Sequence, residues 1–375
     1  MINTKELISL AQDLIRINSE NPPGNEKKCA HLVSEYLMHL GLKVKLYEFK
    51  RARTNVVAEY KSPGSKKILL VTAHLDTVPA GSSWKFNPFA AEIHKNRIYG
   101  RGAADCKGNL AVLLAVMDSI VRNKINLGYN LLFLASSDEE TGSRLGIVPL
   151  LNKKIIRPDA AVILDSDDFD IITAQKGLIH FKVKVSGKKA HGAYPYMGKN
   201  AIELASRMIL DIKKMKFKCK THKLLKAPTV NIGTIQGGDK VNIVADWCEF
   251  CVDLRFLPGM KAGNILRQIK KIISRYTNDF KIEINDMQIP FEIEKKHFLV
   301  KHLIKALKDY KIVSKIKGSE GATVITFFQD SKIPAIATGF SNPNTMHISD
   351  EYIDIKNLVK GATVLESYLK RLSFE

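Results

Sequence analysis

A histidine and an aspartate stand two residues apart after an apolar run of the chain. Residues 68–72 are all apolar or β-branched, which predicts a short strand buried on both faces. His74 and Asp76 follow at its carboxyl end, where α/β folds collect functional residues. A histidine in this position can bind a divalent metal, and the neighbouring carboxylate can orient its ring. When such a pair is isolated, its histidine more often lies in a loop and binds no metal. The prediction of a metal site therefore needs further clusters of ligands.

Two acidic clusters accompany other predicted elements. Asp105 lies in the glycine-rich segment 100–108, just before a predicted helix, where glycines permit tight turns beside a ligand. The segment is not a phosphate-binding loop, since the Gly-Lys-Ser/Thr ending is missing. Glu139 and Glu140 belong to three consecutive acids that follow the apolar run 131–135. Like charges crowded at a strand end repel one another unless a cation or solvent neutralises them, so the alternatives are a metal site and an exposed acidic turn.

Two further candidates complete the set of ligands. Asp165 follows the apolar run 160–164, and His347 follows the predicted strand 333–338. Two histidines and three carboxylates give a mixed nitrogen and oxygen set, which suits zinc, cobalt or manganese. Their number suits two ions about 3.5–4 Å apart that share one carboxylate, as in two-metal hydrolases. The adjacent glutamates allow one to bind metal while the other stays free as a base.

The elements around these residues predict two domains. Strand and helix patterns alternate over the first part of the chain and resume in the last part, which is typical of an α/β sheet with helices on both faces. Between them, strands and helices follow the β-α-β-β-α-β order of a ferredoxin-like fold. We therefore predict a catalytic domain formed by residues 1–172 and 287–375, with an inserted α+β lid domain at residues 173–286.

The composition is that of an ordinary globular protein. The chain of 375 residues is 45% hydrophobic and 26% charged, with no apolar stretch of membrane-spanning length. Its N-terminus lacks a secretory signal, so we expect a cytoplasmic location. Five cysteines in a chain of this size do not indicate a disulfide framework. Cys248 and Cys251 have a zinc-like spacing, but an odd offset within a predicted strand points the thiols to opposite faces.

A net charge of +20 raises nucleic-acid binding as an alternative function. The excess comes from 58 basic against 38 acidic residues, and lysines are densest over residues 213–226. The basic excess lacks aromatic interleaving and a recognisable nucleic-acid-binding module. A solvated lysine-rich surface is therefore favoured, and its field could draw acidic substrates towards a cleft.

Taken in order, these segments resemble the co-catalytic di-zinc aminoacylase and carboxypeptidase family, which includes acetylornithine deacetylase, succinyl-diaminopimelate desuccinylase and glutamate carboxypeptidase. The resemblance begins at residues 14–24 and ends at residues 347–351, so it covers essentially the whole chain. It implies two metal ions held by five side chains. One ion would be held by His74 and Asp165 and the other by Glu140 and His347, with Asp105 as the bridge.

The resemblance also implies roles beside the metals. Asp76 would orient the first histidine, and Glu139 would be the general base that takes a proton from the metal-bridging water and passes it to the leaving amine. A cis peptide bond is expected after the bridging aspartate, between Asp105 and Cys106. Asp165 occupies a position where many members have glutamate, and the shorter side chain still permits ligation.

Four residues are implied to reach the substrate. Residues 186–202 resemble the family segment whose histidine, here His191, polarises the scissile carbonyl, often across a dimer interface. Asn242 would donate a hydrogen bond to the substrate, and Arg255 would clamp its carboxylate. The alternatives are a surface loop for His191 and an ordinary ion pair for Arg255. Glu320 stands at the pocket wall where many members have aspartate, which is nearer to acetylornithine deacetylase-like members.

The sequence therefore predicts a metal-dependent hydrolase that cleaves the amide bond of an N-acyl amino acid, such as an N-acetyl or N-succinyl diamino acid. The expected cofactors are two divalent ions, zinc first and cobalt or manganese as alternatives. The expected partners are this small substrate and a second copy of the chain, joined through the lid domain, and neither a membrane nor a nucleic acid. A di- or carboxypeptidase with the same metal centre is the alternative enzyme. A non-catalytic binding relative is disfavoured because every ligand position and the base are filled.

Overall fold

The computed structural model describes residues 2–374, which form two compact units. Unit 1 contains the described residues up to Thr173, Ile293–Lys317 and the described residues from Thr323 onward. Unit 2 contains Ala174–Glu292 and Gly318–Ala322.

Two short segments belong to unit 2 although the sequence pattern assigns them to the catalytic domain, residues 287–292 and 318–322. Phe291 pairs with Gln175 in an antiparallel ladder. The amide of Lys176 donates a hydrogen bond to a carbonyl of the second segment at 3.1 Å. Backbone pairing of this kind joins segments that are far apart in sequence, so a hydrophobic pattern does not reveal it.

The core of unit 1 is a sheet whose four central strands are parallel. In order across the sheet they are β6 (Asn130–Ser136), β3 (Ile68–His74), β7 (Ala160–Leu164) and β15 (Ala335–Thr338). The antiparallel strands β1 (Val44–Glu48) and β2 (Thr54–Tyr60) extend one edge. At the other edge the sheet continues through β8 (Ile171–Gln175), β13 (Phe291–Glu292) and β14 (Ile316–Ser319), strands whose residues belong partly or wholly to unit 2. The central strands are almost fully buried, which explains their continuous apolar sequences.

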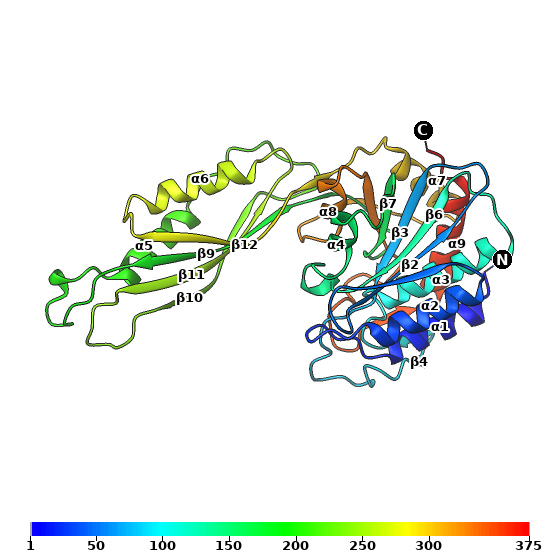
Figure 1. The fold of residues 1–375 in the computed structure, drawn as a ribbon, viewed down its shortest axis with the longest axis horizontal. Helices are drawn as coiled ribbons and strands as arrows, with labels where there is room; N and C mark the ends of the chain where they lie inside the picture. Colours follow the sequence, from blue (N-terminus) through cyan, green and yellow to red (C-terminus); the bar gives the residue numbers. More distant parts are fainter. Residues whose placement is uncertain (1, 375) are drawn as a thin grey trace. The chain divides into compact units, whose positions relative to one another are not determined.

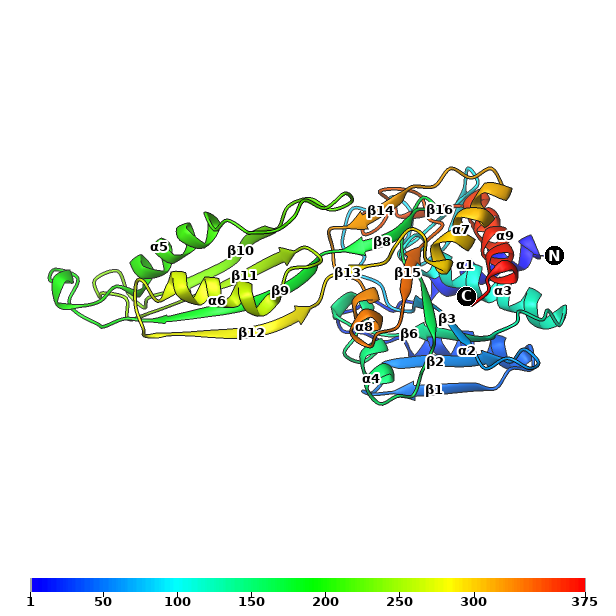
Figure 2. The same cartoon turned by 90° about the horizontal axis from the view of Figure 1, so that it is seen from above.

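Helices cover both faces of this sheet, as Figures 1 and 2 show. One face carries α4 (Ile147–Asn152) and α8 (Ile325–Asp330). The other carries α1 (Thr4–Arg16), α2 (Lys27–His39), α3 (Lys107–Arg122), α7 (Phe298–Asp309) and α9 (Ile355–Arg371). α3 is buried along most of its length and packs against α1, α9 and β3. The predicted α/β fold class is confirmed. No helix within residues 2–374 is long and apolar enough to cross a membrane.

A second sheet of unit 1 has strands too short to predict from the sequence. It consists of β16 (Tyr352–Asp354), β5 (Arg97–Tyr99) and β4 (Glu92–His94), in that order. Three residues cannot display the alternation that marks a strand. β5 ends shortly before Asp105, and β16 begins shortly after His347. Because β16 and β5 pair directly, the sheet brings these two segments of the chain side by side.

Unit 2 has the strand order of a ferredoxin-like fold. Its antiparallel strands lie in the order β10 (Thr229–Gly237), β11 (Trp247–Phe256), β9 (Gly177–Ser186) and β12 (Phe280–Gln288), and one face is covered by α5 (Ala201–Lys213) and α6 (Ala262–Ile273). β11 alternates buried and partly exposed residues, as expected when only one face is covered. Cys248 is buried on the covered face and Cys251 lies on the other, both as free cysteines. The odd offset thus separates the two thiols, as the sequence predicts.

Candidate metal centre

The carboxyl ends of β3, β6 and β7 bring predicted ligands together in unit 1. His74 is the last residue of β3 and pairs with Ser136, the last residue of β6. Two residues separate the end of β6 from a short 3-10 helix, η1 (Glu139–Thr141). Asp165 directly follows β7. These strands are apolar, and charged residues begin only where they leave the core, so the sequence itself places polar groups at this edge.

Asp105 lies between the two predicted histidines, with one carboxylate oxygen directed at each. Its Oδ1 is 2.8 Å from Nε2 of His74, and its Oδ2 is 2.9 Å from Nε2 of His347. The same nitrogen of His347 is 3.3 Å from Oε1 of Glu140. A carboxylate with a different histidine at each oxygen has the geometry of a ligand shared by two metal ions. The peptide bond between Asp105 and Cys106 is cis, as the resemblance implies.

Two groups of three side chains could each hold an ion, because their ligand atoms lie within 4.8 Å of one another. The groups are His74, Glu139 and Asp165, and Asp105, Glu140 and His347. A third group joins Cys106 to His74 and Asp105. The Cys106 sulfur, however, accepts the His74 amide hydrogen at 3.1 Å, and burial raises the pKa of the thiol to about 12. The favourable ligands are therefore nitrogen and oxygen atoms.

The buried surroundings fit a cation. Oε1 of Glu140 is buried and accepts no hydrogen bond from the part of the chain that the structure describes, although His347 lies 3.3 Å away. Glu139, His74 and Asp165 line a small cavity with a volume of about 10 Å³. That is room for one water molecule or one ion. The mixed nitrogen and oxygen donors are those that zinc, cobalt and manganese accept.

Charge crowding shifts the pKa values of this cluster. Burial, reinforced by the Asp105 charge, raises the pKa of Asp165 to about 7, and burial together with the Asp165 charge raises that of Glu139 well above its usual value. The hydrogen bond to Asp105 and the nearby carboxylate of Glu140 raise the pKa of His347 to about 10. Burial opposes ionisation of Asp105, but hydrogen bonds from both histidines outweigh it and hold the pKa of this carboxyl well below its usual range. The cluster therefore retains protons that a bound cation would displace.

Asp76 is fully buried and organises the acidic turn. Nδ1 of His74 lies 2.9 Å from the backbone carbonyl of Asp76 and 3.6 Å from its carboxylate. The carboxylate accepts hydrogen bonds from the amides of Glu139 and Glu140, both at 3.1 Å. It also accepts one from the side chain of Asn21 at 2.8 Å. The carbonyl thus holds the His74 ring, while the carboxylate places the two glutamates, a wider role than the resemblance implies.

Three buried charges behind the acidic turn are not evident from the sequence. Arg53 donates to both carboxylate oxygens of Glu26, at 3.0 and 2.8 Å, and to Asp138 at 2.8 Å. The other Asp138 oxygen accepts the Leu145 amide hydrogen at 2.9 Å, which closes the turn around the two glutamates. The partners of Arg53 are 27 and 85 positions away, so no local pattern connects them.

In unit 2 the structure brings His191 and Asn242 onto neighbouring segments. The amide of Gly192 donates to the carbonyl of Asn242 at 2.8 Å. His191 forms an isolated β-bridge with Ile243, and its side chain is exposed. The amide of Ala193 donates to Nδ1 of His191 at 3.0 Å. The neutral ring therefore carries its proton on Nε2.

Arg255 lies at the opposite end of β11 from that pair. The strand begins at Trp247, shortly after Asn242, and Arg255 stands roughly 25 Å further along it. Its guanidinium makes a bidentate pair with Asp253, at 2.7 and 3.0 Å. Arg255 therefore forms an ion pair with Asp253, which is the alternative to a contact between Arg255 and the substrate carboxylate.

Glu320 is engaged within unit 2. Its Oε2 pairs with Nζ of the buried Lys176 at 2.6 Å, and its Oε1 accepts the Lys226 amide hydrogen at 2.8 Å. Lys176 also donates to the carbonyl of Ala227 at 2.6 Å. Both carboxylate oxygens of Glu320 therefore bind residues 318–322 to the rest of unit 2. From the sequence, this side chain is expected at a pocket wall.

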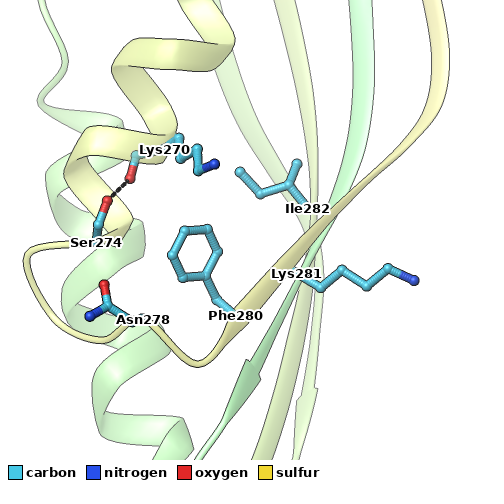
Figure 3. Close-up of a pocket in the computed structure, with 6 residues that line it drawn as sticks. All are labelled: Lys270, Ser274, Asn278, Phe280, Lys281 and Ile282. Atoms are coloured by element: carbon cyan, nitrogen blue, oxygen red, sulfur yellow. Dashed lines mark hydrogen bonds between the residues drawn. The ribbon is translucent and has the colours of Figure 1, made fainter.

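Two larger hollows in unit 2 contain none of the predicted site residues. One, of about 440 Å³, lies between α6 and β12, where Figure 3 shows Phe280 and Ile282 directed towards the helix and Lys281 directed away from it. The other, of about 460 Å³, has a largely cationic lining that includes Lys214, Lys216, Lys271 and Arg275. Neither is lined by a histidine, and Asp211 in the second hollow is the one carboxylate of the two linings, so neither offers a cluster of metal ligands.

Comparison with known proteins gives matches over most or all of the chain. Residues 70–371 match the model of peptidase family M20/M25/M40. An uncharacterized metallohydrolase of Methanocaldococcus jannaschii is 30% identical, over 98% of this chain and 99% of the relative. Acetylornithine deacetylase of Salmonella heidelberg is 30% identical, over 77% of this chain and 76% of the relative. Among solved structures, aminopeptidase PepT of Bacillus cereus has a TM-score of 0.81 at 21% identity and 99% coverage of both chains.

These matches confirm the resemblance deduced from the motifs. They also confirm the predicted enzyme class, a metallohydrolase, for which the two ligand groups of unit 1 supply the structural counterpart. Since the family model covers most of the chain and a relative aligns over nearly its whole length, the chain belongs to peptidase family M20/M25/M40.

Proposed function

We propose that the chain hydrolyses the amide bond of an N-acyl amino acid at a centre of two divalent metal ions. The observation that carries the proposal is Asp105, whose oxygens lie 2.8 and 2.9 Å from nitrogens of two different histidines. A site for a single ion needs no such shared carboxylate. The proposed ligands are His74 and Asp165 for one ion, Glu140 and His347 for the other, and Asp105 for both.

The protein's own groups prepare this centre for the reaction. When bound, such ions supply a lowered water pKa and a polarised carbonyl, with zinc as the proposed metal and cobalt or manganese as alternatives. Asp76 fixes the amides of both glutamates. Glu140 is thereby directed to His347, and Glu139 lines the small cavity. Glu140 can therefore bind metal while Glu139 serves as the base, although the two residues are neighbours in the sequence.

Glu139 is the proposed general base. It lines a cavity with room for one water molecule, and burial raises its pKa, so its carboxylate is a stronger base than an exposed one. In the reaction, Glu139 takes a proton from the attacking water and delivers it to the leaving nitrogen as the C–N bond breaks. The competing role is that of a ligand, since Glu139 also lies within reach of His74 and Asp165.

We also propose that His191 stabilises the developing oxyanion and that a second copy of the chain supplies it. Its Nε2 proton is free to be donated, because Nδ1 already accepts an amide hydrogen. His191 and Asn242 lie beyond the Trp247 end of β11, whereas the other end, at Phe256, pairs with Gly177, where the chain enters unit 2. A residue at the remote end of this unit is suited to reach a neighbouring subunit, which supports a homodimer.

The substrate class is proposed from similarity and charge. A relative at 30% identity is an acetylornithine deacetylase, and a net charge of +20 favours an anionic substrate such as the carboxylate of an N-acyl amino acid. A di- or carboxypeptidase with the same metal centre is the second candidate, because the family model that the chain matches is that of a peptidase family.

Turnover on a panel of substrates tests the proposal. Metal-depleted protein is reloaded with zinc or cobalt and offered acetyl-, succinyl- and formyl-amino acids beside dipeptides, and the released amines are quantified. We expect cleavage of one class of N-acyl amino acid, and none after metal removal or in Glu139→Ala. Cleavage of dipeptides alone would establish the second candidate. Turnover that survives metal removal would exclude the metal mechanism.

A further inference from the structure

Glu351 is a fully buried carboxylate that the proposed mechanism does not use. Its Oε1 accepts hydrogen bonds from the backbone amides of Ala104 and Asp105, at 2.8 and 3.0 Å. Its Oε2 pairs with Nη1 of Arg101 at 2.5 Å, and both side chains are almost inaccessible to solvent. These partners of the carboxylate all lie in residues 101–105, the segment that carries the bridging aspartate.

The same carboxylate stands four residues after His347 in the sequence. Between them, Asp350 accepts hydrogen bonds from the amides of Lys85 and Phe86, at 2.8 and 3.2 Å. The His347 side chain is 50% exposed, so packing gives its ring little support. The position of the ring therefore depends on the points where its loop is attached. Among these points, Glu351 is the one that bonds to the backbone of a proposed metal ligand, Asp105.

Arg101 allows the Glu351 charge to be buried. Its guanidinium lies 3.3 Å from the carbonyl oxygens of Pro79 and Ala80, and 5.1 Å from the centroid of the Trp84 ring. A buried carboxylate is costly unless it is paired and hydrogen-bonded, and Glu351 has both kinds of partner. Buried polar groups that are satisfied in this way fix the geometry of the segments they join.

We propose that Glu351 is a positioning residue that locks the Asp105 segment to the His347 loop and so completes one of the two metal sites. The inference rests on the proposed two-metal function. The site concerned, called here the second site, consists of Asp105, Glu140 and His347. The first site shares Asp105, but its other two ligands, His74 and Asp165, are held by the ends of β3 and β7 independently of Glu351. The second site depends on Glu351 at both Asp105 and His347. Loss of the Glu351 carboxylate should therefore weaken binding of the second ion far more than binding of the first.

Metal titration of Glu351→Gln tests the proposal. Glutamine keeps the size of the side chain but cannot accept hydrogen bonds through both of its terminal atoms. Zinc is titrated into metal-depleted protein by calorimetry, and cobalt absorption follows the two sites separately. We expect the first affinity to stay within about threefold of wild type and the second to fall by about 10–100-fold, as for other groups that support metal ligands.

Asp354→Asn is the matched control. Asp354 follows Glu351 closely in sequence, but its carboxylate accepts hydrogen bonds from Arg97 and Asn342, and neither partner belongs to residues 101–105. Both metal affinities of this variant should equal those of wild type. The comparison separates a specific effect of Glu351 from a general effect of changing this part of the loop.

Equal weakening of both ions in Glu351→Gln, or no change in either, would overturn the proposal. A wild-type protein that binds fewer than two ions would instead refute the two-metal function, so the two failures are distinguishable. If circular dichroism shows that Glu351→Gln does not fold, Arg101→Lys is the second test. It keeps the buried positive charge but loses the planar fork that joins Glu351 to two carbonyls. Selective weakening of the second ion is again expected, and an unselective loss or no loss would overturn the proposal.

Discussion

Glu139 and Glu140 are neighbours in sequence but lie in different surroundings. Glu140 has a carboxylate oxygen 3.3 Å from His347, whereas Glu139 lines a cavity with His74 and Asp165. Their backbone amides are both held by the carboxylate of Asp76. The short helical turn that begins at Glu139 therefore gives the two side chains separate surroundings, in keeping with the separate roles that the resemblance implies.

Glu139→Gln separates the role of a base from that of a ligand. Glutamine has the same shape but cannot take a proton, so kcat should fall by about 10²–10⁴-fold, the usual contribution of a general base. The variant should still retain two ions after dialysis, as counted by inductively coupled plasma mass spectrometry. Glu140→Gln is the matched control, and it should lose an ion. Retention of only one ion by Glu139→Gln would show that Glu139 is a ligand.

The pKa shifts predict that metal affinity rises with pH. The pKa of Asp165 is about 7 and that of His347 is about 10. Both are raised, so below pH 7 both groups carry a proton that an ion must displace. The apparent affinity should rise by at least about tenfold per pH unit between pH 5.5 and 7. Calorimetry in buffers of different ionisation enthalpy measures the affinity and the protons released. A pH-independent affinity without proton release would contradict these shifts.

At the scale of elements, the parallel strands account for how the site is assembled. The carboxyl ends of β3, β6 and β7 deliver His74, the acidic turn and Asp165 to one edge of the sheet. The turn itself is supported from behind by the buried Arg53, between Glu26 and Asp138. The rigidity of the site therefore depends on charges that do not touch the proposed ions.

Arg53→Met tests this support. The substitution leaves Glu26 and Asp138 buried without their partner, and such a loss costs about 3–5 kcal/mol of stability. Urea unfolding at pH 7 measures the change in the free energy of unfolding. Arg16→Met is the matched control, because Arg16 pairs with Asp13 on the surface with side chains 49% and 44% exposed. Its loss should be at most about 1 kcal/mol. Equal losses in the two variants would contradict a structural role for the Arg53 network.

The proposed ligands are predictable from the sequence because each follows a recognisable apolar run or glycine-rich turn. His74 and Asp165 follow strands that are short, continuous and buried. The ion pairs of Arg53 with Asp138 and of Arg101 with Glu351 join residues 85 and 250 positions apart, and no local pattern records such a distance. The strands of the three-stranded sheet are likewise too short to show a period.

The residues proposed for catalysis are distributed over both units of the chain. Unit 1 contains the proposed metal ligands and base, and unit 2 contains His191 and Asn242. The pairing of Phe256 with Gly177 ties the near end of β11 to the entry of the chain into unit 2. His191 lies beyond the far end of that strand, so a site shared between two copies is the arrangement that we propose.

Mixing two inactive variants tests a shared site. His191→Ala and Glu139→Ala homodimers should each be inactive, whereas a mixed dimer contains one site with both residues intact. After subunit exchange, activity should return to about a quarter of wild type, from the statistics of random pairing of a two-fold dimer. Mixing Glu139→Ala with His74→Ala is the control, because both changes lie in unit 1 and should restore nothing. No recovery by the first mixture, despite demonstrated exchange, would refute the shared site.

Anomalous diffraction at the zinc edge from zinc-loaded crystals shows whether Asp105 bridges two ions. We expect two peaks about 3.5–4 Å apart, one beside each carboxylate oxygen of Asp105. One peak should lie against His74 and Asp165, and the other against Glu140 and His347. A single peak, or two peaks without Asp105 between them, would refute the proposed two-metal centre.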